Sequence, residues 1–385
     1  MKIGLPKEIK NNENRVGLTP KAVETLVNNG NEVFVETNAG IGSGFSDDEY
    51  IKAGAKILPS AAQVWDNEMV VKVKEPLESE YKYFKPGLLL FTYLHLADNL
   101  PLTKALLEKK VTGIAYETMS KDHTLPLLAP MSRVAGRRAA IIAATFLESH
   151  RGGNGLLPGG VDDNDPKKPT TEKGLFLIIG GGVAGYNAAY TAMGLGANVT
   201  LLERNPERIK VLKVDKRLEA LSAVFNNKLV VEESNDTNIN KWISSADALI
   251  STVLIPGAKA PKVIKTPMVQ NMKQGAIVID IAIDQGGSVE TITKITTHDD
   301  PTYNVHGVSH YAVANMPGAT PRTSTAALVN ATTEYAVKLA KNGINSALSD
   351  KTIFEGINTI DGKLTSKPVA EALKLQFTDA MSLLK

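Results

Sequence analysis

Short apolar runs alternate with longer stretches of helical spacing along most of the chain. Such runs predict buried parallel strands, and their alternation with helices is typical of an α/β protein. In the first third of the chain the predicted strands are 2–5, 32–36, 69–74, 88–91 and 112–116. A second series is predicted at 175–179, 199–202, 229–231, 248–253 and 276–280. The pattern therefore predicts two parallel sheets, the second doubly wound with five strands.

Helix signals lie between and around these strands. Thr19 is expected to cap a helix that begins at Pro20. Residues 131–149 are rich in alanine and arginine with helical spacing and are expected to bridge two domains, and 324–343 is the clearest amphipathic run. Residues 152–174 concentrate glycine, proline and charge, which predicts an exposed loop.

The strongest functional signal lies between residues 175 and 203. The predicted strand 175–179 leads into Gly180, Gly182 and Gly185, which supply the spacing G-x-G-x-x-G at a strand-to-helix turn. In that geometry the first glycine allows the tight turn, the second lets the backbone approach a pyrophosphate, and the third lets the helix pack closely on the strand. The helix N-terminus favours an anion through its free N–H groups and its dipole. We therefore expect a dinucleotide to bind here.

An acidic residue completes this signature. Glu203 ends the second predicted strand of the series, about 20 residues after the glycines, where a carboxylate binds ribose hydroxyls. A carboxylate there repels a 2′-phosphate, so we expect the cofactor NAD. Arg204 and Arg208 follow closely and are able to offset part of this repulsion, which leaves some use of NADPH open.

The order of the elements divides the chain into two domains. A chain of 385 residues exceeds the usual size of one compact domain. We expect an NAD-binding Rossmann domain over 131–309. Residues 310–385 are more helical and are expected to return to residues 1–130, which makes the substrate domain discontinuous. We expect both domains to be Rossmann-like and the active site to lie in the cleft between them.

Composition narrows the class of protein. With 43% hydrophobic residues, 22% charged residues and a formal net charge of +2, nothing indicates disorder or a surface for nucleic acid or anionic membranes. The absence of cysteine excludes disulfides and thiolate chemistry. No apolar run approaches the roughly 20 residues that span a bilayer, and the first residues lack a signal-like apolar region. We therefore expect a cytoplasmic protein that acts on small molecules, with no nucleic-acid or membrane partner.

Polar residues beyond the predicted strand ends are the candidates for chemistry, because ligands of open α/β sheets bind there. Lys74 ends one strand and His95 follows another. Taken alone, Lys74 is more often a solvated lysine, and a structural role for His95 is about as common as a catalytic one. Arg15 lies in a polar loop, where most arginines are solvated. Asp284 opens a Gly-rich turn, and there a ligand-facing role and a turn role are equally open.

The other histidines of the second half give no metal pattern. His298, His306 and His310 are scattered and lack acidic neighbours at metal-ligand spacing. A structural role is favoured for them, and no metal is predicted.

A series of ordered motifs runs along most of the chain. They are GLPKEIKNNENRVGLTP from Gly4, VKVKEP ending at Pro76, FTYLHL ending at Leu96, PLLAPMS ending at Ser132, IGGGVAG from Ile179, VLIPGAKAP from Val253, DIAIDQGG from Asp280 and HYAVANMPGA from His310. Together they resemble the L-alanine dehydrogenase family, which is related to the nucleotide-binding subunit of proton-translocating transhydrogenases. The resemblance implies two Rossmann-like domains, the first completed by C-terminal residues, and a hexameric homo-oligomer.

The resemblance also implies an activity, the reversible oxidative deamination of L-alanine to pyruvate and ammonia with NAD. Carried over by motif, Arg15 would hold the substrate carboxylate, which its planar guanidinium suits, and Lys74 would polarise the carbonyl or imine. His95 would act as general acid and base. Asp284 would help to move protons and to position the amine.

Further residues are implied around substrate and cofactor. Asn315 and Met316 would lie between the substrate and the nicotinamide. The other expected cofactor contacts are Ser132, Gly180, Gly182, Val183, Gly185, Glu203, Arg208, Val253, Leu254, Ile281 and Asp284.

Three features depart from the family pattern. Glu203 stands where members usually carry Asp, which keeps the acidic role on a longer arm. Arg133 stands where an acidic or small residue is usual. This difference could alter the contacts of the protein with the nucleotide or at an interface. The loop over 152–174 is longer and more charged than in most members. We expect this difference to be confined to the protein surface.

Two other functions stay open at this point. A transhydrogenase nucleotide-binding subunit would pass hydride to another nicotinamide, but such relatives generally lack the histidine of the FTYLHL motif. A non-catalytic NAD-binding sensor would keep the glycines and lose the substrate residues. Arg15, Lys74, His95 and Asp284 are all present, which favours the dehydrogenase.

Overall fold

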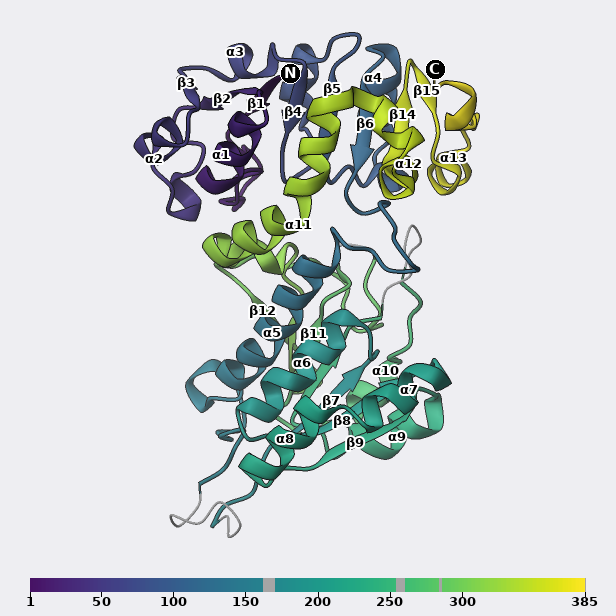
Figure 1. Cartoon of the computed structure of the whole chain (residues 1–385). Coiled ribbons are helices and arrows are strands. Elements are labelled where there is room, and N and C mark those ends of the chain that lie inside the picture. The colour runs from purple at the N-terminus through teal and green to yellow at the C-terminus, as the bar shows by residue number, and fades with distance from the viewer. Residues whose placement is uncertain (162–169, 254–259, 284–285, 385) are drawn as a thin grey trace. The chain divides into compact units, whose positions relative to one another are not determined.

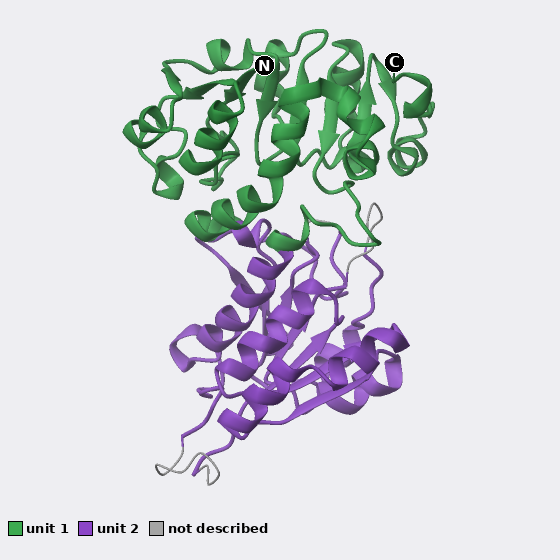
Figure 2. Cartoon of the chain, viewed as in Figure 1, with its two compact units in different colours: residues 1–131, 318–385 green, residues 132–317 purple. Residues whose placement is uncertain are grey.

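The computed structural model describes residues 1–161, 170–253, 260–283 and 286–384. The chain forms two compact units (Figure 2): unit 1 comprises residues 1–131 and 318–385, and unit 2 comprises residues 132–317. Each unit is built on one mainly parallel sheet with helices packed against it. The α/β class with two domains, predicted from the alternation of apolar runs and helices, is confirmed.

The chain returns to unit 1 later than the sequence suggested. The expected limit between 309 and 310 falls inside strand β13 (Val308–Tyr311), which pairs in parallel with β11 (Ile277–Asp280). Residues 310–317 therefore belong to unit 2, and unit 1 resumes at Gly318. The earlier limit lies inside a single helix, α5 (Ala129–Phe146).

Unit 1 contains an eight-stranded sheet in the order β15-β14-β6-β5-β4-β1-β2-β3. Strands β1 to β6 pair in parallel, whereas β14 pairs antiparallel with β6, and β15 antiparallel with β14. The C-terminal part of the chain thus extends the sheet that the N-terminal part begins. The strands are β1 Lys2–Leu5, β2 Glu32–Glu36, β3 Lys56–Leu58, β4 Met69–Val71, β5 Leu89–Thr92, β6 Thr112–Ala115, β14 Ile357–Ile360 and β15 Lys363–Leu364.

The helices of unit 1 pack against this sheet (Figure 1). The expected cap is present: the Thr19 hydroxyl accepts a hydrogen bond from the Ala22 amide, and Pro20 opens α1. Helix α11 lies against α1 and thereby ties the C-terminal segment to the first one. The α-helices are α1 Pro20–Asn28, α2 Asp47–Lys52, α3 Ala61–Trp65, α4 Leu100–Glu108, α11 Pro321–Asn342, α12 Lys351–Gly356 and α13 Lys367–Leu373. The 3₁₀ segments are η1 Ile41–Ser43, η2 Glu78–Tyr83, η3 Leu96–Asp98, η7 Gly343–Leu348 and η8 Ala380–Ser382.

Unit 2 contains a seven-stranded sheet in the order β12-β13-β11-β10-β7-β8-β9. Without its antiparallel edge strand β12, this is the 3-2-1-4-5-6 order of a doubly wound dinucleotide fold. The strands other than β11 and β13 are β7 Leu175–Ile179, β8 Asn198–Glu203, β9 Leu229–Glu233, β10 Ala248–Ser251 and β12 Thr302–Val305. The helices after α5 are η4 Ser149–Arg151, α6 Val183–Gly194, α7 Pro206–Lys213, α8 Lys216–Phe225, α9 Asp236–Ile243, α10 Thr266–Gln270 and η6 Met316–Ala319.

Alternating side chains of the central strand β7 build a core on each face of the unit 2 sheet. Phe176 and Ile178 pack with apolar residues of α5, α6 and α8. Leu177 and Ile179 pack with residues of α9 and α10 on the opposite face. Because both faces are covered, the strand is apolar throughout, as expected for a parallel sheet between helical layers.

The prediction of five strands for this sheet was incomplete. Strand β12 is a partly exposed edge strand without a continuous apolar run, and its turn into β13 passes through His306 and Gly307, both with positive φ. In β13, His310 is polar and yet fully buried, because its ring nitrogens bond the Thr291 hydroxyl at 2.7 Å and the Val308 carbonyl at 2.9 Å. A hydrophobicity pattern alone does not reveal such a strand.

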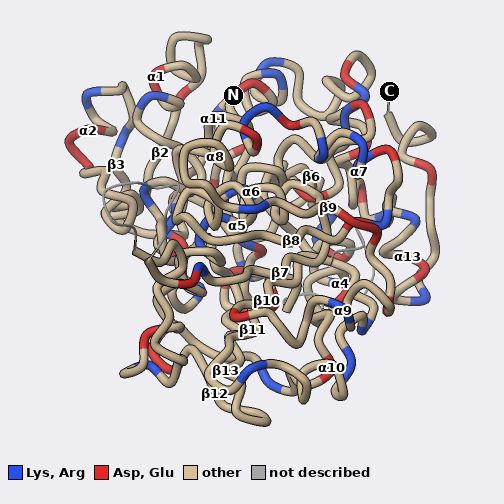
Figure 3. Tube along the Cα trace, turned by 90° about the horizontal axis from the view of Figure 1, so that it is seen from below, with Lys and Arg blue, Asp and Glu red and all other residues tan. Residues whose placement is uncertain are grey.

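Basic and acidic residues are interspersed along the helices and loops of both units (Figure 3), in keeping with the small net charge of +2. Among the residues that the structure describes, no helix combines the length and the apolar character needed to cross a membrane.

Candidate functional site

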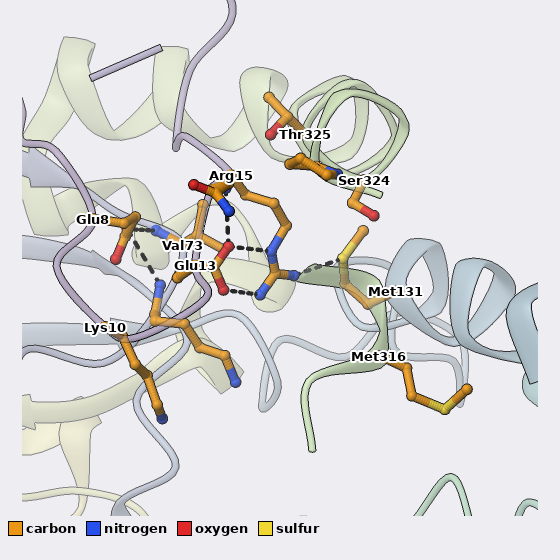
Figure 4. A network of polar contacts seen from close by, with 12 residues as sticks. Glu8, Lys10, Glu13, Arg15, Val73, Met131, Met316, Ser324 and Thr325 are labelled. Carbon is orange, nitrogen blue, oxygen red and sulfur yellow. Dashed lines mark hydrogen bonds and ion pairs between the residues drawn. The ribbon is translucent and has the colours of Figure 1, made fainter. Parts of the chain in front are cut away.

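Arg15 is buried in unit 1, paired with Glu13 two residues earlier (Figure 4). The Arg15 Nε donates to Glu13 Oε1 at 2.7 Å, and Nη2 donates to Glu13 Oε2 at 2.5 Å. This two-point geometry suits a planar guanidinium and a carboxylate. Burial by itself would lower the pKa of Arg15, but the bonds to Glu13 outweigh it and raise the pKa. The expectation that most loop arginines are solvated is wrong for this one.

Contacts from distant segments fix the loop that carries Arg15. The Arg15 Nη1 lies 3.0 Å from the sulfur of Met131, and the amide of Val16 donates to the Thr325 hydroxyl of α11 at 3.1 Å. The same hydroxyl lies 2.8 Å from the hydroxyl of Ser43 in η1. Helix α11 therefore takes part in holding this loop in place.

Lys74 follows β4 beside a cluster of buried charges. Lys72, two residues earlier, is 1% exposed, and its Nζ lies 3.1 Å from both Glu8 Oε2 and Glu80 Oε1. Glu8 also accepts hydrogen bonds from the backbone amides of Val73 at 2.6 Å and Lys74 at 3.4 Å. Burial raises the pKa of Glu8, although Lys72 opposes this. The cluster fixes the backbone on which Lys74 stands.

His95 lies just beyond β5 in a left-handed conformation, with φ of 48°. Its backbone amide donates to Glu117 Oε1 at 2.6 Å, and the Leu94 amide donates to the same carboxylate at 3.2 Å. The imidazole is 40% exposed, its Nδ1 lies 4.0 Å from Glu117 Oε1, and it stacks on Tyr93 at 5.8 Å between ring centroids. A ring held by its backbone and open to solvent on one side is able to exchange protons with a ligand.

Charge interactions connect the three candidates of unit 1. Burial by itself would raise the pKa of Glu75, but Lys74, Lys10 and His95 together lower it. Burial raises the pKa of Tyr93, and the positive charge of Arg15 opposes this. The Tyr93 hydroxyl donates to the Leu127 carbonyl at 2.6 Å. The structure thus brings Arg15, Lys74 and His95 to one region of unit 1, around Glu75 and Tyr93.

The glycine turn of unit 2 has the geometry that the motif predicts. Gly180 has a φ of 98°, which favours glycine. A Cβ on Gly185 would lie 1.7 Å from the Gly180 carbonyl, so the close packing of α6 requires glycine there. Gly182 caps α6 before Val183, and apart from its chain neighbours no atom of the described residues lies within 4 Å of the place where its Cβ would stand. Open space therefore adjoins the N-terminus of this helix.

Glu203 and Arg208 bind the backbone of this turn. Glu203 Oε2 accepts from the Gly181 amide at 2.6 Å and Oε1 from the Asn205 amide at 2.8 Å. The Arg208 Nε donates to the Gly181 carbonyl at 2.8 Å, and its guanidinium lies 5.9 Å from the ring centroid of Tyr186. Arg204 is exposed. Of the two arginines, Arg208 is therefore held at the turn by the protein itself.

The other predicted cofactor residues that the structure describes lie beyond strand ends of unit 2 or near the start of α5. Val253 follows β10, Ile281 follows β11, and Ser132 lies near the start of α5; all three are partly buried. Asn315 has a φ of 58°, and Met316 is buried at the start of η6. Asp284 and Leu254 lie outside the described residues. Among the described residues, no group of three or more acidic or histidine side chains is arranged to hold a metal ion.

Sequence reasoning missed Glu13, Lys72, Glu8 and Glu117 as parts of this region. A lysine in the apolar run of residues 69–73 was a usable signal, because a buried lysine requires an acidic partner. No local signal pointed to Glu117, since its contact with His95 depends on the pairing of β5 with β6.

The doubly wound sheet of unit 2 and its glycine turn place this chain among the two-domain oxidoreductases that have an NAD-binding fold. The model of the alanine dehydrogenase/PNT N-terminal domain matches residues 4–135, and the model of the C-terminal domain matches residues 139–367. The chain belongs to the alanine dehydrogenase/PNT family.

Named relatives and solved structures agree with this assignment. Alanine dehydrogenase of Staphylococcus saprophyticus is 56% identical over 100% of both chains, and alanine dehydrogenase 2 of Staphylococcus aureus is 55% identical over 98% of both. A solved L-alanine dehydrogenase is 45% identical, with a TM-score of 0.89 over 97% of this chain and 99% of that one. A transhydrogenase from Sinorhizobium meliloti, at 24% identity and a TM-score of 0.78 over 95% of this chain and 99% of that one, shares the fold.

The buried charge cluster around Lys72 leads to a stability prediction. Lys72→Met would leave the carboxylates of Glu8 and Glu80 buried without their cation, which typically costs about 3–5 kcal/mol. Lys82→Met is the matched control, because Lys82 is an exposed lysine of the neighbouring η2 and surface changes usually stay within about 0.5 kcal/mol. Urea denaturation of both variants measures the difference.

The loss of unfolding free energy caused by Lys72→Met should depend on pH. Without the lysine, a buried carboxylate has a folded pKa above its unfolded value, so the folded state takes up a proton as the pH falls. The loss of stability relative to wild type is therefore largest at neutral pH and shrinks below it. An equal effect of the two lysine substitutions would contradict the account of this cluster.

Proposed function

We propose that this chain catalyses the reversible NAD-dependent oxidative deamination of L-alanine to pyruvate and ammonia. The balanced reaction converts L-alanine, NAD⁺ and water into pyruvate, ammonium, NADH and a proton. The proposal rests chiefly on the identity of 55–56% over essentially the whole length to proteins named alanine dehydrogenases. The grouping of Arg15, Lys74 and His95 in unit 1 supports it.

The role proposed for Arg15 is to bind the substrate carboxylate. Its side chain is already oriented by Glu13, so little orientational freedom remains to be lost when a ligand binds. One of its N–H groups points at the sulfur of Met131, which is a weak acceptor. A carboxylate that took this bond would make a stronger, charge-assisted one.

Lys74 and His95 are proposed to act on the reacting end of the substrate. The ammonium of Lys74 would stabilise negative charge that develops on the carbonyl or carbinolamine oxygen. His95, exposed on one side and fixed through Glu117, would take a proton from that oxygen during deamination and return it in the reverse direction. Following the resemblance, Asp284 is proposed to help manage protons and to position the amine.

The residues of unit 2 fit a bound NAD. The N-terminus of α6 with the open space beside Gly182 suits a pyrophosphate, and each oxygen of Glu203 keeps capacity to accept from a ribose hydroxyl. When bound, NAD supplies the acceptor of the hydride. The further contacts proposed are those expected from the sequence: Ser132, Val183, Arg208, Val253, Leu254, Ile281, Asn315 and Met316.

The proposal extends to assembly and location. Following the resemblance we propose a hexamer, and the cysteine-free composition suits a reducing cytoplasm. The transhydrogenase alternative is not favoured, because the likeness at 24% identity concerns the fold alone. The sensor alternative is not favoured either, because the relatives at more than twice that identity are named as enzymes.

The activity is tested by following NADH oxidation with pyruvate and ammonium. We expect turnover that requires all three components and that a chelator does not reduce. Glyoxylate and 2-oxobutyrate serve as comparison substrates for selectivity. Folded protein that binds NADH and turns over no 2-oxo acid with ammonium would favour the sensor.

His95→Asn should lower kcat by about 10²–10⁴, the usual effect of removing a positioned proton-transfer group. Asparagine tolerates the left-handed backbone of this position, so the fold should be kept. His123→Asn is the matched control, since His123 is also exposed and has a φ of 59°. Near-normal turnover of His95→Asn in steady-state kinetics would remove His95 from the mechanism.

NADH should be preferred over NADPH, because the Glu203 carboxylate is anchored at the turn and repels a 2′-phosphate. Arg208 is already bonded to the Gly181 carbonyl, and Arg204 can move into solvent. Glu203→Gln should lower the ratio of kcat/KM with NADH to kcat/KM with NADPH. Glu207→Gln, which changes an exposed acid of the same segment, should leave this ratio unchanged. A ratio at or below one in the wild type would show that the arginines set the specificity.

A further inference from the structure

Two adjacent arginines of α5 point to different partners. The Nε of Arg137 donates to the side chain of Asn187 in α6 at 3.0 Å, and its guanidinium lies 5.5 Å from the ring centroid of Tyr190. Arg138, about 100° further round the helix, is directed instead to the turn that follows β13. Its Nη1 donates a hydrogen bond to the carbonyl of Met316. A sequence of two arginines in a helix does not distinguish these roles.

The turn that Arg138 reaches is held at two successive residues. Asn315 has a left-handed backbone, with φ of 58°, and the imidazole of His298 makes a hydrogen bond to its backbone. Arg138 binds the next residue, Met316, and also bonds the hydroxyl of the buried Tyr311 at the end of β13. One side chain thus connects α5, the end of β13 and the turn.

The charge states of Arg138 and His298 are compatible with their positions beside the same turn. Burial, and after it the positive charge of Arg138, lower the pKa of His298, which favours its neutral imidazole. A neutral imidazole beside a guanidinium avoids the repulsion between two partly buried cations and still donates one hydrogen bond. Left-handed backbone at a non-glycine residue persists where the surroundings determine it, and these contacts supply such surroundings.

We propose that Arg138 is a positioning residue for the reaction, which holds the turn of Asn315 and Met316 in one conformation with the help of His298. This inference rests on the proposed function, in which Asn315 and Met316 lie between the substrate and the nicotinamide. The contacts of Arg138 in the structure are with Met316 and Tyr311. It acts through the backbone of the turn, so that the Asn315 side chain is presented in a fixed direction.

The first test compares Arg138→Met with Arg137→Met. Methionine keeps an unbranched side chain and removes every N–H donor. We expect Arg138→Met to lower kcat/KM for pyruvate about 10- to 100-fold, an effect of misplacement, while Arg137→Met stays within about twofold. Arg138→Lys, which keeps a donor, should recover part of the loss. An equal loss in both methionine variants, or a fall in thermal midpoint with unchanged kcat/KM per folded molecule, would overturn the positioning role.

A double-mutant cycle tests whether Arg138 acts through Asn315. Asn315→Gly removes the side-chain carboxamide, and glycine readily adopts the left-handed backbone conformation of this position. If the arginine works by directing this side chain, Arg138→Met should change kcat/KM much less in the Asn315→Gly background than in the wild type. Additive effects would overturn the proposal.

Hydrogen exchange separates this inference from the proposed function, because it needs no turnover. Mass spectrometry of the segment 312–320 should show faster amide exchange in Arg138→Met than in Arg137→Met and wild type. If the wild type oxidises no NADH with pyruvate and ammonium, the proposed function fails while the exchange result still decides whether Arg138 holds the turn. Unchanged exchange in Arg138→Met would overturn the role assigned to Arg138.

Discussion

A charge buried away from water must be paired, and this constraint organises the strand ends of unit 1. Arg15 is buried with Glu13, and Lys72 with Glu8 and Glu80. These pairs also fix the backbone, since Glu8 binds the amide of Val73 next to Lys74. Arg15 and Lys74, which we propose act on the substrate, therefore stand on segments that internal ion pairs hold in place. Preorganisation of this kind lowers the ordering cost of binding and fixes the direction of each donor.

In unit 2, carboxylates at strand ends are stabilised by hydrogen bonds from backbone amides. Glu203 receives the amides of Gly181 and Asn205, and Asp280 at the end of β11 receives those of Ala282, Ser288 and Val289. Burial raises the pKa of Asp280 in spite of these bonds. Both carboxylates stand where a parallel strand ends and a loop begins. In each case one side chain determines the shape of a loop at the ligand-binding edge of the sheet.

A shared fold and a close sequence relationship carry different information about function. The fold is shared with a transhydrogenase at 24% identity, whereas the relatives named alanine dehydrogenases are 55–56% identical over 98–100% of the chain. What separates such proteins chemically is the set of side chains at the strand ends. In this chain one of these strand ends carries His95, whose backbone amide donates to Glu117 beyond the neighbouring strand.

The sequence by itself determined the features that depend on local backbone chemistry. The strand bounds of β1, β2 and β7, the Thr19 cap and the glycines at 180, 182 and 185 were all predicted, because apolar runs, capping residues and glycine conformations act over a few residues. Only the tertiary structure decided that β13 joins the sheet of unit 2 and that β14 pairs antiparallel with β6. It likewise decided that Arg138, rather than Arg137, reaches Met316, because such pairings arise when segments distant in sequence pack together and no local pattern encodes them.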